Sequence, residues 1–114
     1  MLSIELLLKS TNYSLIKANS GQKGLDYLHS SNINIDLILL DLMLPDVYGL
    51  DFLAAIKNNE LHAKIPVIIQ SGTSDQNEIN KAYKMGIAGF IEKPFNKEVL
   101  ISTIERILQL HLAA

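Results

Sequence analysis

Asp41, Ser71 and Lys93 are the residues of this 114-residue chain whose types and positions could support phosphoryl chemistry. Each follows a short, mainly apolar segment, so each is expected at the end of a strand. A carboxylate can attack phosphorus as a nucleophile, while a hydroxyl and an ammonium group can donate hydrogen bonds to phosphoryl oxygens. The three residues therefore predict a pocket for an aspartyl phosphate, provided that the fold brings them together. Pro94 follows the lysine, and a cis bond there would let a tight turn direct Lys93 toward the pocket.

The elements that must position this pocket alternate between strands and helices. The run from Ile35 to Leu40 is apolar apart from Asp36, which fits a strand covered by helices on both faces. Ligands of such sheets bind beyond the carboxyl ends of the strands, where Asp41 lies. This α/β pattern predicts a doubly wound parallel sheet. The predicted strands are 14–18, 35–40, 66–71 and 89–92, and the predicted helices are about 2–12, 20–30, 50–59, 75–86 and 96–112.

Length and composition are those of one small globular domain, which we expect to span residues 1–114. Hydrophobic residues make up 48% of the chain and charged residues 19%, and a net charge of -2 offers no attraction to nucleic acid. No segment approaches the ~20 apolar residues of a membrane span. The chain has no cysteine for a disulfide or a thiolate metal site. We therefore expect a cytoplasmic protein that binds neither nucleic acid nor membrane.

Three stretches around the candidate residues resemble the receiver domain of bacterial two-component response regulators. They are DLMLP at 41–45 with Gly49, PVII at 66–69 leading to Ser71 and Gly72, and GIAGFIEKPF at 86–95. The resemblance covers essentially the whole chain and implies a flavodoxin-like fold. It also implies that Asp41 takes a phosphoryl group from a phosphohistidine on a histidine kinase or a histidine phosphotransfer protein.

The same resemblance implies a role for each neighbour of Asp41. Ser71 would be the switch hydroxyl that moves to bind the new phosphoryl group, and Lys93 would be the cation that pairs with it. Phe90 would be the aromatic residue that turns inward when Ser71 moves. Magnesium would be held by Asp41, by the backbone carbonyl of Met43 and by an acidic pair at the end of the family's first strand. The chain would be a signalling module rather than an enzyme, and it would contact a downstream protein through its last two helices.

From the resemblance, we expect the family's first strand and its acidic pair to be missing from this sequence. Counted back from Asn12, the pair would fall a few residues before Met1, and the strand would lie at the centre of the sheet, between 14–18 and 35–40. We therefore expect a flavodoxin-like sheet that is incomplete at its N-terminal strand, with weak magnesium binding and slow or absent phosphorylation of Asp41. The unpaired strand edges would also favour a homodimer.

Other carboxylates are poor replacements for the acidic pair. Asp36 begins the strand that leads to Asp41, so it lies about 16 Å away, at the wrong end of the sheet. Asp46 and Asp51 flank the loop after Asp41 and could approach it, but a mobile loop supplies the octahedral geometry of magnesium poorly.

Two explanations of the missing strand remain open. The chain is either a receiver whose start is lacking from the sequence, or a degenerate receiver that acts as a protein interaction module without phosphate. A hydrolase on the same fold would need a base, and no histidine lies near a predicted strand end. Simpler roles also remain open, with Asp41 as a loop acid, Ser71 as a helix cap, Lys93 as a solvated lysine and Phe90 as a core residue.

Several residues depart from the expected pattern. Tyr48 stands where the family often has an aspartate as helix cap, which predicts a helix start less stable by about 1 kcal/mol. Gln70 places an amide in an otherwise apolar strand, without an evident role. His29, His62 and His111 are not grouped for a metal, and we expect all three to be exposed.

Overall fold

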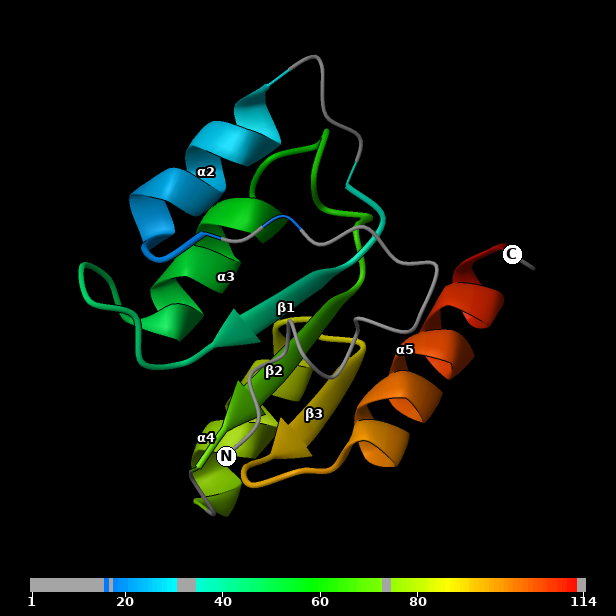
Figure 1. The fold of residues 1–114 in the computed structure, drawn as a ribbon. Helices are drawn as coiled ribbons and strands as arrows, with labels where there is room; N and C mark the ends of the chain where they lie inside the picture. Colours follow the sequence, from blue (N-terminus) through cyan, green and yellow to red (C-terminus); the bar gives the residue numbers. More distant parts are fainter. Residues whose placement is uncertain (1–15, 17, 31–34, 73–74, 113–114) are drawn as a thin grey trace.

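The computed structural model describes residues 16, 18–30, 35–72 and 75–112, which form four helices and a three-stranded parallel sheet (Figure 1). The strands lie in the order β1-β2-β3. Parallel neighbours need a crossover connection, which α3 and α4 supply. The elements are α2 (Gly21–His29), β1 (Ile38–Asp41), α3 (Gly49–Lys57), β2 (Val67–Ser71), α4 (Gln76–Lys84), β3 (Gly89–Glu92) and α5 (Lys97–Leu112).

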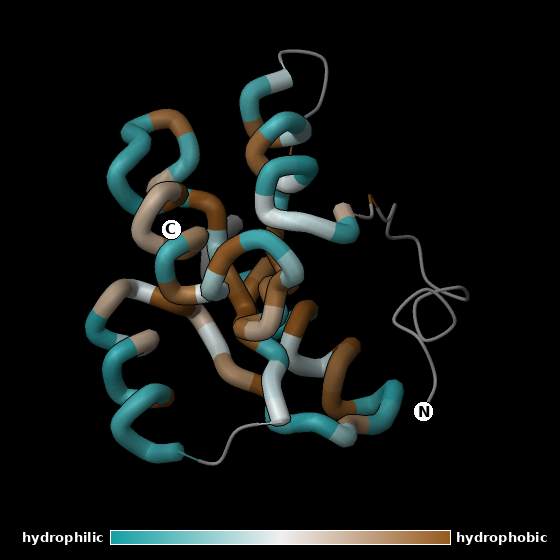
Figure 2. The backbone as a smooth tube through the Cα atoms, turned by 90° about the vertical axis from the view of Figure 1, so that its left-hand side faces the viewer, coloured by the Kyte–Doolittle hydropathy of each residue, from teal (hydrophilic) through white to brown (hydrophobic). Residues whose placement is uncertain are grey.

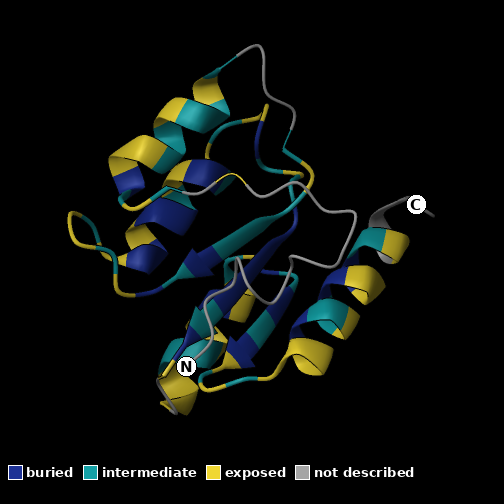
Figure 3. Cartoon of the chain, viewed as in Figure 1, coloured by how far each residue is buried: buried dark blue, intermediate teal, exposed yellow. Residues whose placement is uncertain are grey.

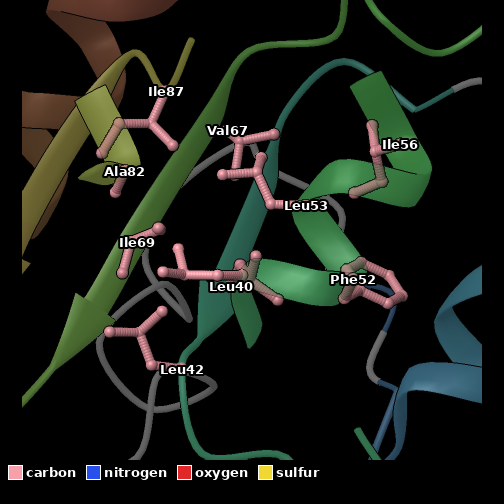
Figure 4. Packing of buried hydrophobic residues seen from close by; sticks show 10 residues of the cluster. Leu40, Leu42, Phe52, Leu53, Ile56, Val67, Ile69, Ala82 and Ile87 are labelled. Atoms are coloured by element: carbon pink, nitrogen blue, oxygen red, sulfur yellow. The ribbon is translucent and has the colours of Figure 1, made fainter. Parts of the chain in front are cut away.

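Helices cover both faces of the sheet. One hydrophobic cluster joins β1 and β2 to α3 and α4, with Leu53 of α3 fully buried at its centre (Figure 4). Leu25 and Leu28 of α2 pack against the edge of this cluster. The second cluster lies between the sheet and α5, which contributes Leu100 and others. The helices therefore wind around both sides of the sheet, as the sequence pattern predicts.

The strands of this sheet are apolar on both sides because both sides are covered. Val67, Ile68 and Ile69 of β2 are all fully buried, although successive side chains of a strand point to opposite faces. The helices instead carry apolar residues toward the sheet and polar residues outward (Figure 2). On α5 the exposed residues follow the outer side of the helix (Figure 3). The core is thus a layer on each side of one sheet.

Side-chain caps fix the starts of three helices. The Ser20 hydroxyl accepts a hydrogen bond from the Lys23 backbone N–H at α2, and the Asp75 carboxylate accepts one from Asn77 at α4. Asn96 does the same for α5, where its Oδ1 lies 2.8 Å from the backbone nitrogen of Val99. These contacts explain why the predicted starts agree with the observed ones to within a residue.

Three of the four predicted strands are confirmed within small shifts of their ends. The fourth, at 14–18, lies mostly outside the described residues, and its described residues Ile16 and Ala18 belong to no strand. The prediction is therefore wrong for these two residues. The described sheet ends at β1 on this side, so it contains no further strand to which these two residues could be hydrogen-bonded. The predicted helix at 2–12 lies outside the described residues.

The expectation that every histidine is exposed is wrong for His62. Its side chain is 8% exposed, and its Nε2 lies 3.0 Å from the carbonyl oxygen of Leu28. The carbonyl comes from the last turn of α2, so the buried ring keeps a hydrogen-bond partner. The ring of His29 lies beside it, tilted by 34° with ring centres 5.5 Å apart, and His29 is itself exposed. The side chain of His111 lies outside the described part of the chain.

No helix among the described residues is both long and apolar enough to cross a membrane.

Candidate functional site

Asp41 and Lys93 meet at the carboxyl end of the sheet. Asp41 is the last residue of β1, and Lys93 follows the last residue of β3. The Nζ of Lys93 donates to the Oδ2 of Asp41 over 2.5 Å, and both side chains are about 30% exposed, at 28% and 30%. The Lys93–Pro94 peptide bond is cis. The Lys93 ammonium group thus contacts the carboxylate of Asp41, the candidate nucleophile, at a position that is partly open to solvent.

Ser71 ends the strand between these two residues. It is the last residue of β2 and is only 4% exposed. Its carbonyl oxygen accepts a hydrogen bond of 2.8 Å from the backbone nitrogen of Lys93. Asp41 lies opposite Gln70 in the sheet, so Ser71 is one residue further along the neighbouring strand. Asp41, Ser71 and Lys93 therefore all lie at the carboxyl end of the sheet.

Phe90 lies on the face of the sheet that carries the first hydrophobic cluster. It is opposite Ile69 on the neighbouring strand and packs against the cluster around Leu53 while remaining half-buried. Ser71 is two residues beyond Ile69, so it belongs to the same face. An aromatic ring and a hydroxyl thus occupy one side of β2 and β3, near the end where the lysine meets the carboxylate.

Of the magnesium ligands that the resemblance implies, Asp41 and Met43 lie in the described part of the chain. Both carboxylate oxygens of Asp41 already accept hydrogen bonds. Oδ1 accepts one of 2.9 Å from the backbone nitrogen of Met43, and Oδ2 accepts one from the ammonium group of Lys93. Across the described ranges, no three acidic, histidine or cysteine residues come together as metal ligands. Asp41 and the carbonyl of Met43 would supply only two of the six oxygen ligands of magnesium, several of which are usually water molecules.

Asp46, which we expected to be a poor replacement for the acidic pair, caps a helix instead. Its two carboxylate oxygens accept hydrogen bonds from the backbone nitrogens of Gly21 and Gln22, at 2.8 and 3.0 Å. The bond from Gly21, followed by the bond from Gln22, holds the pKa of Asp46 below its ordinary value. The carboxylate thus caps the start of α2 from a distant loop. No sequence pattern indicates this contact, because the partners are about 25 residues apart.

Tyr48 joins the loop after Asp41 to helix α4. It is the cap residue of α3 but provides no side-chain cap, as expected from its type. Its hydroxyl instead donates to the carboxylate of Glu78. This bond is the main reason why the pKa of Tyr48 is raised to about 12, with burial and nearby negative charge adding to it. Tyr48 also forms an isolated bridge with Met43, so the loop is attached to both Asp41 and α4.

Comparison with protein families gives one match over most of the chain. The model of the response regulator receiver domain matches residues 1–105. The cell cycle transcriptional regulator CtrA of Caulobacter vibrioides is 33% identical over 107 residues, which is 94% of this chain and 45% of the relative. The chain spans less than half the length of the curated relatives that it matches.

Solved structures have the same fold. The receiver domain of a putative Luxo repressor protein from Vibrio parahaemolyticus superposes with a TM-score of 0.86 at 26% identity, covering 96% of this chain and 81% of that one. The phosphorylated cyanobacterial phytochrome response regulator RcpA gives a TM-score of 0.78 at 27% identity, covering 96% and 83%. The fold is therefore flavodoxin-like, as expected.

Proposed function

Because this chain belongs to the response regulator receiver domains, we propose that Asp41 is its phosphoacceptor in two-component signalling. The donor would be a phosphohistidine on a histidine kinase or a histidine phosphotransfer protein. The observation that carries this proposal is the 2.5 Å contact between Lys93 Nζ and Asp41 Oδ2 at the carboxyl edge of a parallel sheet. The downstream protein or domain that responds to this phosphorylation is a separate question from the identity of the phosphoacceptor.

The proposed reaction needs little covalent chemistry from the protein. A carboxylate oxygen of Asp41 forms a bond to phosphorus, the phosphorus–nitrogen bond of the phosphohistidine breaks, and the leaving imidazole takes up a proton. Lys93 pairs with the phosphoryl oxygens as they approach, and the Ser71 hydroxyl donates to one of them. Phe90, on the same face as Ser71, then turns inward as the hydroxyl moves.

We further propose that phosphorylation of this chain is slow. A divalent cation would neutralise charge on the phosphoryl group during transfer. Since the described residues bring no three acidic, histidine or cysteine side chains together as ligands, magnesium binding in this chain would be weak, and Lys93 would be left as the main positive charge at Asp41. A receiver whose missing first strand supplied two acids would react normally at the same aspartate.

A receiver that acts by contact alone is the second candidate function. It would need no phosphoryl group on Asp41 and would depend only on side chains exposed at the surface. The contact surface would be α4, β3 and α5, where Tyr83 and Val99 are 49% and 44% exposed. In either case we propose a cytoplasmic, non-enzymatic module that also associates with itself, without binding nucleic acid or membrane.

Intact mass measurement with a small phosphodonor and magnesium tests the proposal. The chain and Asp41→Asn would be compared with a version of the chain extended by a first strand that ends in two acids. We expect no gain or a slow gain of one phosphoryl group in the chain itself, a full gain in the extended version, and none in extended Asp41→Asn. Failure of the extended version would support the contact-only function. Rapid phosphorylation of the original chain would contradict the proposed impairment.

A further inference from the structure

Helix α4 is anchored to the rest of the domain by few buried side chains. Among its residues, all of which the structure describes, Ala82 alone is buried. Helix α3, which packs against the same hydrophobic cluster, buries five residues. An element with few buried contacts shifts or opens at a lower cost in free energy than the core around it. A polar contact at one end of α4 therefore has a large share in fixing the position of that end.

Tyr48 makes such a contact with the start of α4. Its hydroxyl donates a hydrogen bond to the carboxylate of Glu78, which lies in the first turn of the helix. Tyr48 is 40% exposed and Glu78 is half-buried, so this bond lies near the surface and can break without opening the core. The bond connects α4 to the loop that follows β1.

The backbone of Tyr48 leads in the other direction, to the candidate phosphoacceptor. Tyr48 forms an isolated antiparallel bridge with Met43. The backbone N–H of Met43 in turn donates a hydrogen bond of 2.9 Å to Oδ1 of Asp41. A continuous series of contacts therefore runs from the carboxylate of Asp41, through Met43 and Tyr48, to Glu78 on α4.

The first contact of this series depends on the charge of Asp41. An N–H group binds an ionised carboxylate more strongly than it binds a neutral oxygen. Phosphorylation would turn the carboxylate into an acyl phosphate, whose remaining carboxyl oxygen is a neutral carbonyl. The hydrogen bond from Met43 would then weaken, or would be lost if Oδ1 itself took the phosphoryl group.

We propose that the hydrogen bond between Tyr48 and Glu78 is a link through which the charge of Asp41 acts on the first turn of α4. In the unmodified chain the charged carboxylate binds Met43, the bridge positions Tyr48, and the tyrosine hydroxyl fixes the start of the helix. Loss of the charge loosens this series and releases the first turn. The inference deepens the proposed function, on which its role in signalling rests, because α4 belongs to the proposed contact surface.

The variant Asp41→Asn tests the link without phosphate, because it replaces the carboxylate by a neutral group of nearly the same shape. The reporter is the backbone amide of Ile79, which donates to the Asp75 carbonyl oxygen in the first turn of α4. Its NMR chemical shift would be measured with and without Asp41→Asn in the full chain, in Tyr48→Phe and in Tyr83→Phe. The last is the matched control, since it removes the hydroxyl of another exposed tyrosine, on α4 itself.

We expect Asp41→Asn to move the Ile79 amide signal in the full chain and to move it equally in Tyr83→Phe. In Tyr48→Phe the change should fall by about half or more, because residues of one hydrogen-bonded network do not act independently. An undiminished change in folded Tyr48→Phe would overturn the proposal. The absence of any change in the full chain would overturn it as well.

Two variants of Glu78 examine the other partner of the link. Glu78→Gln keeps an oxygen that can accept the tyrosine hydroxyl, so the response of the Ile79 amide to Asp41→Asn should be retained. Glu78→Leu removes the acceptor and should reduce the response as Tyr48→Phe does, and an undiminished response would contradict the link. Because no phosphate is used, a chain that is never phosphorylated would refute the proposed function, while these shifts would still decide whether the link exists.

Discussion

Lys93 meets Asp41 across 52 residues of sequence because each follows a strand of one parallel sheet. This meeting could be predicted from residue types and strand ends alone. The partners of Asp46 and Tyr48 could not, because they lie on helices 25 and 30 residues away and follow no periodic pattern. Single side chains that connect a loop to a distant helix leave no repeated signal in a sequence.

Replacing Asp46 by asparagine should destabilise the domain at neutral pH, because the cap of α2 loses its charge and one of its two acceptors. Since the folded-state pKa of Asp46 lies below its ordinary value of 3.8, the stabilisation is complete above 3.8 and is lost as the pH falls through the folded-state pKa. Urea unfolding at neutral pH and well below pH 3.8 would measure this. Asp36→Asn, at an exposed position, is the control. An equal effect of Asp46→Asn at both pH values would contradict the capping role.

Replacing Tyr48 by phenylalanine should lower the free energy of unfolding by at most about 1 kcal/mol, because the hydrogen bond to Glu78 is exposed to solvent. The raised pKa means that the hydroxyl stabilises the folded state below about pH 10, and that this contribution is lost as the pH rises toward about 12. Denaturation across this alkaline range would show the difference between wild type and variant shrinking. Tyr83→Phe, at another exposed tyrosine, should show no such trend.

At the scale of elements, local signals predicted most of the fold. Ser20, Asp75 and Asn96 marked helix starts correctly because caps act within three residues. The apolar runs at β1 and β2 marked buried strands. Ile16 and Ala18 come from a segment predicted as a strand and lie in none, because a strand is stable only when a neighbour accepts its hydrogen bonds, and composition carries no information about that neighbour.

The loop between β1 and α3 is held by a backbone contact that only glycine allows. The Gly49 nitrogen donates to the Leu42 carbonyl oxygen over 2.8 Å, and a Cβ on Gly49 would lie 2.5 Å from the Leu42 Cα and 2.8 Å from the Asp41 carbonyl oxygen. We expect Gly49→Ala to cost about 1–3 kcal/mol and to weaken the contact between Asp41 and Lys93. Chemical denaturation and lysine side-chain NMR would measure both effects.

Gly72→Ala is the matched control for this experiment, since among the described atoms none lies within 4 Å of the Cβ that it would add. We expect it to change stability little. A Gly49→Ala variant as stable as Gly72→Ala would show that the loop after Asp41 adapts freely, and that its shape does not define the site.

At the scale of the whole molecule, the described sheet has three strands and β1 lies at one edge. Leu37 directly precedes β1 and Leu39 lies within it, and both are only partly buried on the side of the sheet that faces α5. An apolar strand at an edge favours pairing with a second copy. We expect the mass in solution, measured by sedimentation, to rise with concentration, and a version extended by the first strand to remain monomeric. A chain that stays monomeric at high concentration and unfolds cooperatively would contradict this.

The identity of the phosphorylated residue tests the central claim most directly. The chain extended by a first strand with two acids would be treated with a small phosphodonor and magnesium. The acyl phosphate would then be reduced with borohydride, and the modified residue would be located by peptide mass spectrometry. We predict modification at Asp41 alone, next to Lys93. Modification at Asp46 or Asp51 instead would show that the pocket formed by Asp41, Ser71 and Lys93 is not the site of phosphoryl transfer.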